Sequence, residues 1–168
     1  LHPYIVGVLI GDGSVNSGCI TFTSADVDLV VNVAAHLPEN CKITKDPNRD
    51  YSYRIVDVDR YNKKSVAREI VKKSGIYGKV AHEKFIPDSY KFASVDDRFA
   101  LLQGLMDTDG SASGGQVTYH TTSKKLADDV RFVVQSLGGV ATFNIKPDHR
   151  GYRDVYCLTI IFPENVRI

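Results

Sequence analysis

Two stretches of the chain are apolar on nearly every side of a predicted helix. In residues 4–11 every position is hydrophobic or glycine, and residues 99–106 are almost as apolar. A helix without a polar face has to be buried on all sides. Each stretch carries two small residues four positions apart on one face: Gly7 and Gly11, and Gly104 and Thr108. Small residues at this spacing let two helix backbones approach closely, so we expect the two helices to pack against each other.

The pattern that follows each apolar helix is also repeated. Asp12-Gly13-Ser14 aligns with Asp109-Gly110-Ser111. An alternating stretch comes next, then the N-cap candidates Thr23-Ser24 and Thr122-Ser123, then an amphipathic stretch, which predicts a strand followed by a capped helix. After the apolar helix, the first half is predicted to contain strand 19–23, helix 25–37, strands 42–45 and 51–58, and helix 65–74. The second half is predicted to contain strand 116–120, helix 124–137, and strands 140–146 and 152–162.

The repeat predicts an α+β fold with internal pseudo-twofold symmetry. Each half has the order α-β-β-α-β-β, and a final helix is visible only in the first half. We expect two four-stranded antiparallel sheets on either side of a central two-helix interface. Residues 1–91 would form the first repeat and residues 92–168 the second, within one compact domain. Duplex DNA has an approximate twofold axis too, and protein symmetry tends to mirror that of the bound site.

Composition narrows the class of protein. A hydrophobic fraction of 43% fits a packed core, and no apolar run approaches the ~18 residues of a membrane span. Cys19, Cys41 and Cys157 are scattered, which argues against a zinc site or a disulfide framework and favours a reducing compartment. We therefore expect no membrane partner and a cytoplasmic or nucleoid-associated protein that is not secreted. A net charge of +1 does not by itself indicate a nucleic-acid partner.

Asp12 and Asp109 are the strongest candidates for chemistry. Each follows an apolar helix and precedes a glycine, so close packing of the two helices would place both carboxylates side by side at the helix C-termini. The partial negative charge there and the mutual repulsion disfavour two ionised carboxylates, and a divalent cation would reverse that balance. Asp-Gly is also a common turn dipeptide, but its repetition after two buried helices favours a site. A calcium-binding EF-hand is excluded because residues 111–116 supply no acidic ligand.

At this point the chain resembles the LAGLIDADG homing endonucleases. The two signature segments are Ile5–Gly13 and Leu102–Gly110, and the resemblance covers essentially the whole chain. It is nearest to intein endonuclease domains, because Lys84-Phe-Ile-Pro87 and Phe92-Ala-Ser94 precede the second segment. The resemblance implies a site-specific endonuclease that makes metal-dependent double-strand breaks in a long DNA target and leaves short 3′ overhangs. The alternative is a protein of the same fold that binds nucleic acid without cleavage, as an RNA maturase or a DNA-binding regulator.

The resemblance also implies roles for individual residues. Asp12 and Asp109 would be catalytic and metal-binding, with Gly11 and Thr108 beside them in the metal site. Lys84 would be the basic catalytic residue; its other interpretation is a solvated surface lysine. The cofactor would be Mg²⁺, as two or more ions, and Mn²⁺ or Ca²⁺ could substitute for binding. The partner would be double-stranded DNA, bound by a monomer that is fused to, or derived from, an intein splicing domain.

Strand alternation identifies the side chains that would face DNA. Short polar groups and cations on the face away from the helices are candidates for major-groove contacts: Thr21, Thr23, Lys42, Thr44, Ser52 and Arg54, and Gln116, Thr118, His120, Thr142, Asn144 and Lys146. Cations at the hairpin tips are candidates for phosphate contacts: Lys45, Arg49, His149, Arg150 and Arg153. The other interpretation is that solvent-facing strand positions are polar in most proteins. Asp107 aligns with Ile10 rather than with an acid, so we expect it to have a structural role.

Overall fold

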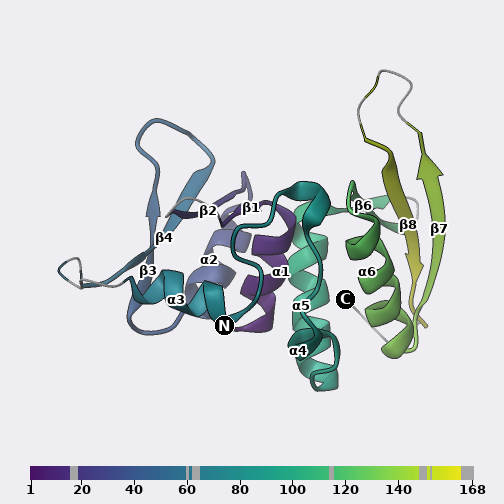
Figure 1. Cartoon of the computed structure of the whole chain (residues 1–168), viewed down its shortest axis with the longest axis horizontal. Helices are drawn as coiled ribbons and strands as arrows, with labels where there is room; N and C mark the ends of the chain where they lie inside the picture. Colours follow the sequence, from purple (N-terminus) through teal and green to yellow (C-terminus); the bar gives the residue numbers. More distant parts are fainter. Residues whose placement is uncertain are drawn as a thin grey trace.

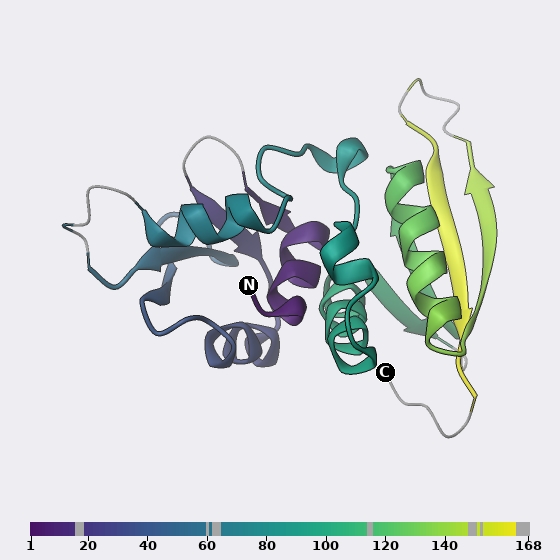
Figure 2. The same ribbon diagram turned by 60° about the horizontal axis from the view of Figure 1, so that its bottom comes forward.

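The protein consists of two similar α/β units on either side of a central pair of helices (Figure 1). The computed structural model describes residues 1–15, 19–59, 61, 65–113, 116–147, 151 and 153–163. In Figure 2 the two central helices are again side by side, with one unit on each flank. Among the described helices, none has the length and apolar character needed to cross a bilayer.

From the central helix to the fourth strand, the order of elements is the same in both halves. The first half contains α1 (Pro3–Gly11), β1 (Gly13–Ser14), β2 (Ile20–Thr23), α2 (Val27–Ala35), β3 (Cys41–Lys45), β4 (Ser52–Asp57) and α3 (Val66–Lys73). A linker follows, with a 3₁₀ turn, η1 (Ala81–Glu83), and a short helix, α4 (Asp88–Lys91). The second half contains α5 (Val95–Asp109), β5 (Gly110–Ser113), β6 (Gln116–Thr121), α6 (Lys124–Ser136), β7 (Val140–Lys146) and β8 (Val155–Ile161). The predicted α-β-β-α-β-β repeat is therefore confirmed.

The two sheets have equivalent topologies. The strand orders are β1-β2-β4-β3 and β5-β6-β8-β7, and all pairs are antiparallel. The register is conserved between the halves as well, because Gly13 lies opposite Phe22 and Gly110 lies opposite Tyr119. The predicted pair of four-stranded antiparallel sheets is confirmed.

Two helix starts differ from the sequence expectation. α2 begins at Val27, because Asp26 and not Ser24 is the N-cap: its side chain accepts a hydrogen bond from the amide of Asp28 at 2.8 Å. α5 begins at Val95, before the apolar stretch, with Ser94 as the N-cap and two acidic residues in its first turn. Acidic side chains at that end are favoured by the helix dipole. The apolar pattern of the sequence therefore predicts only the buried part of α5 and not its acidic first turn.

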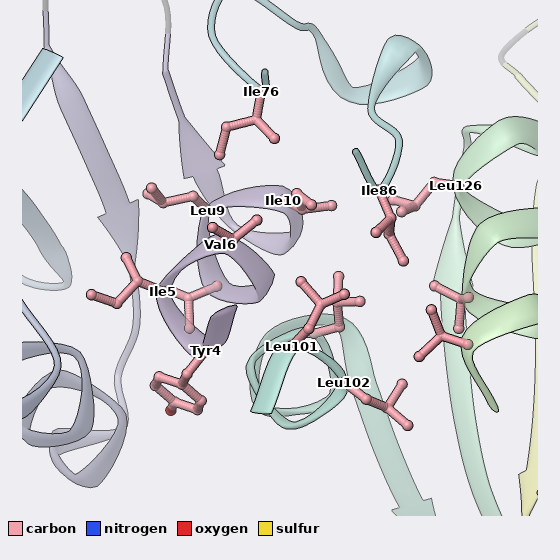
Figure 3. Close-up of a cluster of buried hydrophobic side chains, with 14 of the residues drawn as sticks. Tyr4, Ile5, Val6, Leu9, Ile10, Ile76, Ile86, Leu101, Leu102 and Leu126 are labelled. Carbon is pink, nitrogen blue, oxygen red and sulfur yellow. The ribbon is translucent and has the colours of Figure 1, made fainter. Parts of the chain in front are cut away.

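One continuous core joins the two halves. All residues from Tyr4 to Gly11 of α1 are buried, as a helix with no polar face requires. Figure 3 shows Leu9 and Ile10 of α1 close to Ile76 and Ile86 of the linker. Ile86 is fully buried and also lies next to Leu126 of α6. The linker therefore packs against both halves and fixes their relative position.

Candidate active site

The central helices are in contact through a reciprocal pair of glycines. A Cβ placed on Gly7 would overlap the carbonyl oxygen of Leu101, and a Cβ placed on Gly104 would overlap the carbonyl oxygen of Tyr4. The same Cβ on Gly104 would lie 3.0 Å from the amide nitrogen of Val8. Each glycine thus accommodates the backbone of the other helix at the equivalent position. The close helix contact predicted from the small residues is confirmed.

This contact brings the two aspartates together. Asp12 is the C-cap of α1 and Asp109 is the last residue of α5. A Cβ placed on Gly11 would lie 3.4 Å from Oδ2 of Asp109, so that carboxylate reaches across to the end of α1. Both aspartates line one open cavity of about 360 Å³, together with Lys84 and His120. The spatial arrangement expected from the two Asp-Gly motifs is present.

The surroundings of Asp12 and Asp109 disfavour the ionised form of both carboxylates. Partial burial raises the pKa of Asp12, which is the more exposed of the pair. Burial and the nearby charge of Asp12 raise the pKa of Asp109 to about 6, and the Lys84 ammonium opposes this rise. Burial lowers the pKa of Lys84, while Asp109 and Asp12 act against that shift. A single ammonium thus faces two carboxylates, which leaves a net negative charge suited to a cation.

Lys84 is held in place by the linker. Its Nζ donates hydrogen bonds to the carbonyl oxygens of Gly11, at 2.5 Å, and Gly13, at 3.2 Å. Its own carbonyl oxygen accepts a hydrogen bond from the Ser123 hydroxyl at 2.7 Å. Two residues further along, the amide of Ile86 donates to Asp129 at 3.1 Å. These contacts exclude the alternative that Lys84 is a solvated surface lysine.

Asp129 is a positioning residue that the sequence pattern did not single out. It is only 4% exposed, and besides Ile86 it accepts hydrogen bonds from Lys91 and Lys125. The signal that could have identified it is its place on the apolar face of α6, three residues after the buried Leu126. A buried carboxylate requires partners of this kind, and here they hold the linker that carries Lys84.

The oxygen groups at the site fit a hard divalent cation. Mg²⁺ is bound in proteins by one or two carboxylates, with water and substrate phosphates as further ligands. The hydroxyl of Tyr119 is buried and has no hydrogen-bond partner among the described residues, although buried hydroxyls are normally paired. Burial raises the pKa of Tyr119 further above its ordinary value with help from the charges of Asp109 and Asp12. An unpaired hydroxyl near two carboxylates is consistent with a further polar ligand or water at this position.

Gly11 and Thr108 have fewer oxygen atoms available to a cation than Asp12 and Asp109 have. The carbonyl oxygen of Gly11 already accepts a hydrogen bond from Lys84. The Thr108 hydroxyl donates to the carbonyl oxygens of Gly104 and Leu105 at 3.1 and 2.9 Å, so its side chain is committed to its own helix. Main-chain oxygens are therefore what these two residues could offer to a cation.

The outer face of the first sheet carries most of the expected polar side chains. The register places Thr21, Arg54 and Thr44 in one row across β2, β4 and β3, and the other exposed candidates of this half are Thr23, Lys42, Lys45 and Arg49. Ser52 is a correction, because it is on this face but only 8% exposed. The small Ser52 side chain is a register neighbour of Thr23 and lies beside the ion pair between Asp46 and Arg54, so it is not open to direct base contact.

The second sheet has an equivalent outer face. Thr118, Thr159 and Thr142 form one row across β6, β8 and β7, and His120, Cys157 and Asn144 form the next. The remaining candidates, Gln116, Lys146 and Arg153, are exposed, whereas His149 and Arg150 lie outside the described residues. Thr159 is not among the sequence candidates, although alternation along its strand places it on this face as well.

A second cavity lies on the other side of the helix pair. It has a volume of about 500 Å³, and Tyr4, His36, Met106 and Asp107 are among its lining residues. The Tyr4 hydroxyl donates a hydrogen bond to Asp107 at 2.7 Å, which gives Asp107 the structural contact expected of it. The residues of α1 that align with Met106 and Asp107 are instead covered by the linker. Of the described residues that line this cavity, none is a lysine or arginine, so no counterpart of Lys84 is found here.

Comparisons with known proteins agree with this geometry. Residues 96–168 match a family model described as a LAGLIDADG-like domain. The fold is similar to that of the homing endonuclease I-DmoI in complex with DNA and Mn, with a TM-score of 0.63 and 16% identity over 95% of this chain and 88% of that chain. The chain has the LAGLIDADG fold. A structure of mesophilic I-DmoI variants gives a TM-score of 0.60 at 19% identity, over 95% and 87% of the two chains.

Curated relatives of this LAGLIDADG-fold protein are much longer. The replicative DNA helicase DnaB of Mycobacterium intracellulare is 28% identical over 137 residues, which are 81% of this chain and 19% of the helicase. The replication factor C small subunit of Methanocaldococcus jannaschii is 28% identical over 164 residues, 96% of this chain and 9% of that protein. RecA of Mycobacterium tuberculosis is 30% identical over 151 residues, 82% and 18% of the two. The chain spans less than a fifth of the length of each.

Proposed function

We propose that this LAGLIDADG-fold protein is a site-specific homing endonuclease that makes metal-dependent double-strand breaks in a long DNA target. The observation that carries the proposal is the placement of Asp12 and Asp109 at adjacent ends of the two central helices, in one open cavity. The similarity to I-DmoI supports it, because structures of I-DmoI hold DNA with Mn, Mg or Ca.

The proposed cation site consists of Asp12 and Asp109 with the main-chain oxygens of Gly11 and Thr108. These residues would hold two or more Mg²⁺ ions between the scissile phosphates, and Mn²⁺ or Ca²⁺ could replace Mg²⁺ for binding. Such metals, when bound, stabilise charge on phosphoryl oxygens and lower the pKa of bound water. Asp12 and Asp109 would hold these ions, and the Lys84 ammonium would position water or offset negative charge as it develops on the phosphate.

The outer faces of the two sheets are the proposed DNA-binding surface. Major-groove edges require short donors and acceptors with a few cations, which is what the rows containing Arg54 and Thr142 present. The exposed cations at the strand ends, such as Arg49 and Arg153, would contact phosphates, which provide affinity rather than sequence preference. His149 and Arg150 remain candidates for the same role.

We further propose that one chain acts as a monomer and comes from an intein-type setting. Each half supplies one aspartate, so a single chain completes the site. Three differently named relatives match this chain over only a small part of their length, and this chain has no Gly-rich nucleotide-binding P-loop of its own. Matches to short segments of several differently named larger proteins are expected of an insertable unit that resides within, or derives from, a larger protein. DNA as the partner would place it in the cytoplasm or at the nucleoid.

A selection followed by a cleavage assay tests the proposal. Cleaved sequences are first selected from a random DNA library, and a plasmid carrying the selected site is then incubated with Mg²⁺ or with EDTA. We expect cleavage only with Mg²⁺, and its loss in Asp12→Asn and in Asp109→Asn. Asp107→Asn is the matched control, because it removes a carboxylate from the same helix outside the cation cavity, and cleavage should persist.

Two outcomes would contradict the proposal. Cleavage that survives in both Asp12→Asn and Asp109→Asn would exclude the carboxylate pair as the cation site. DNA that is bound but stays intact with every divalent cation would favour the alternative, a LAGLIDADG protein that binds nucleic acid without cleaving it.

A further inference from the structure

Arg54 occupies the centre of the outer face of the first sheet. It lies on β4, which is flanked by β2 and β3, and its direct neighbours across the strands are Thr21 and Thr44. These neighbours are short, and the Arg54 side chain is 45% exposed. In this row, the Arg54 side chain is therefore the one that reaches furthest from the sheet.

The guanidinium is not free to move over the sheet. Its Nη2 donates a hydrogen bond to Oδ2 of Asp46, and this is also the ion pair that Arg54 makes. The other oxygen of Asp46, Oδ1, accepts a hydrogen bond from the amide of Asn48 at 2.9 Å. Asp46 is only 8% exposed. The Asn48 amide and the Arg54 guanidinium lower the pKa of the Asp46 carboxyl, so it is ionised at neutral pH.

This pairing distinguishes two possible roles for Arg54. A phosphate-contacting cation contributes through its net charge, and a fixed carboxylate at hydrogen-bond distance would cancel most of that contribution. Base recognition depends instead on orientation, because the planar arginine fork has to meet O6 and N7 of guanine together. Holding the side chain in place before binding reduces the entropy lost on association. The arrangement therefore favours base recognition.

We propose that Arg54 contacts one guanine in the major groove and that Asp46 is the positioning residue that orients it. This inference rests on the proposed function, since it assigns a sequence-determining contact within the DNA target of the first sheet. Four of the five N–H donors of a guanidinium remain when one is bound to Asp46, which is enough for a bidentate contact. The β3–β4 hairpin that carries both residues extends away from the central helices (Figure 1).

The test is a base-preference profile of DNA binding with Ca²⁺ in place of Mg²⁺. The selected target is substituted one base pair at a time, and the dissociation constant is measured for the 168-residue chain and its variants. In the unmodified protein one G·C pair should be preferred over the other bases by about five- to 150-fold, the range of a good bidentate contact. Arg54→Gln should remove this preference, because glutamine lacks the arginine fork and its amide matches adenine rather than guanine.

Asp46→Asn is the decisive variant. We expect it to weaken the preference at the same base pair, while the affinity for random-sequence DNA stays equal or rises because a negative charge is lost. The double variant with Arg54→Gln should be no worse in preference than Arg54→Gln alone. A purely structural role of Asp46 would instead weaken binding to all sequences equally. Lys45→Gln, which removes an exposed cation at the end of the neighbouring strand that is a candidate for phosphate contact, is the matched control and should lower all affinities while the base profile persists.

The failure of this inference can be told apart from failure of the proposed function. If no sequence is enriched in the selection, both are overturned. If a target is selected but Arg54→Gln keeps the guanine preference, or Asp46→Asn leaves it unchanged while binding remains intact, the endonuclease proposal stands and the assignment of Arg54 and Asp46 is wrong. Should Asp46→Asn fail to fold, as judged by circular dichroism, the Arg54→Gln result decides.

Discussion

Replacing Asp109 by asparagine should stabilise the metal-free protein. The pKa of Asp109 is raised to about 6 from an ordinary value of 3.8, so the ionised form is disfavoured in the folded state. That difference corresponds to about 3 kcal/mol at neutral pH. Because part of the carboxylate is exposed, solvent screening reduces the expected gain to about 1–2 kcal/mol. For a chain of this length, this corresponds to a rise in Tm of about 2–8 °C.

The size of this stabilisation depends on pH. A carboxyl whose pKa is higher in the folded state binds more protons there, so stability falls as pH rises from about 4 to about 6 and then levels off. Asparagine lacks this titration. The stabilisation by Asp109→Asn should therefore be full above pH 7 and vanish below pH 4. Asp12 is unchanged in the variant, so the gain reports on removal of one carboxylate.

Thermal unfolding in EDTA and in Mg²⁺, followed by circular dichroism across pH, measures both sides of the prediction. In EDTA at pH 8 the variant should unfold at a higher temperature than the unmodified protein. A divalent cation that binds the folded state should raise the Tm of the unmodified protein and have little effect on the variant. Asp107→Ala is the control of opposite sign, because it removes the acceptor of the Tyr4 hydroxyl. A lower Tm for Asp109→Asn in EDTA, or a gain independent of pH, would refute the reasoning.

Three further predictions concern the same site. Gly7→Ala and Gly104→Ala should each lower the free energy of unfolding by about 1–3 kcal/mol or more, measured by urea denaturation, since either Cβ overlaps a backbone carbonyl. Lys84→Gln should lower the cleavage rate about 100-fold or more while Ca²⁺-dependent DNA binding persists. Tyr119→Phe, which copies Phe22 of the first half, should keep stability in EDTA but raise the Mn²⁺ concentration needed for thermal protection about 10-fold; unchanged protection would refute a role for its hydroxyl.

The features that were predictable from the sequence are those with a period or a repeat. The two apolar helices, the glycines at their contact and the pairing of Asp12 with Asp109 follow from small-residue spacing and burial. The outer faces of the strands follow from alternation. These patterns are local in the chain, and each is enforced by a strong physical requirement, either exclusion of polar groups from the core or backbone contact.

The features that were not predictable depend on contacts between distant segments. Asp129 looks like any acidic residue of an amphipathic helix until the linker residues Ile86 and Lys91 lie against it. Ser52 has the correct alternation but is shielded beside Asp46 and Arg54. Neither the reach of Lys84 to the end of α1 nor the cavity beside Asp107 has a signature in spacing. The environments of Asp129, Ser52 and Lys84, and the cavity beside Asp107, are all determined by tertiary packing.

The covalent linker between the two halves has a consequence for the range of DNA targets. A dimer of identical subunits presents the same surface twice and is restricted to palindromes, because each half-site must satisfy the same side chains. Here the first sheet presents Thr21, Arg54 and Thr44 where the second presents Thr118, Thr159 and Thr142. In the proposed DNA complex, a substitution in one sheet would change one half-site and leave the other alone. Preference for an asymmetric target could therefore be acquired one base pair at a time.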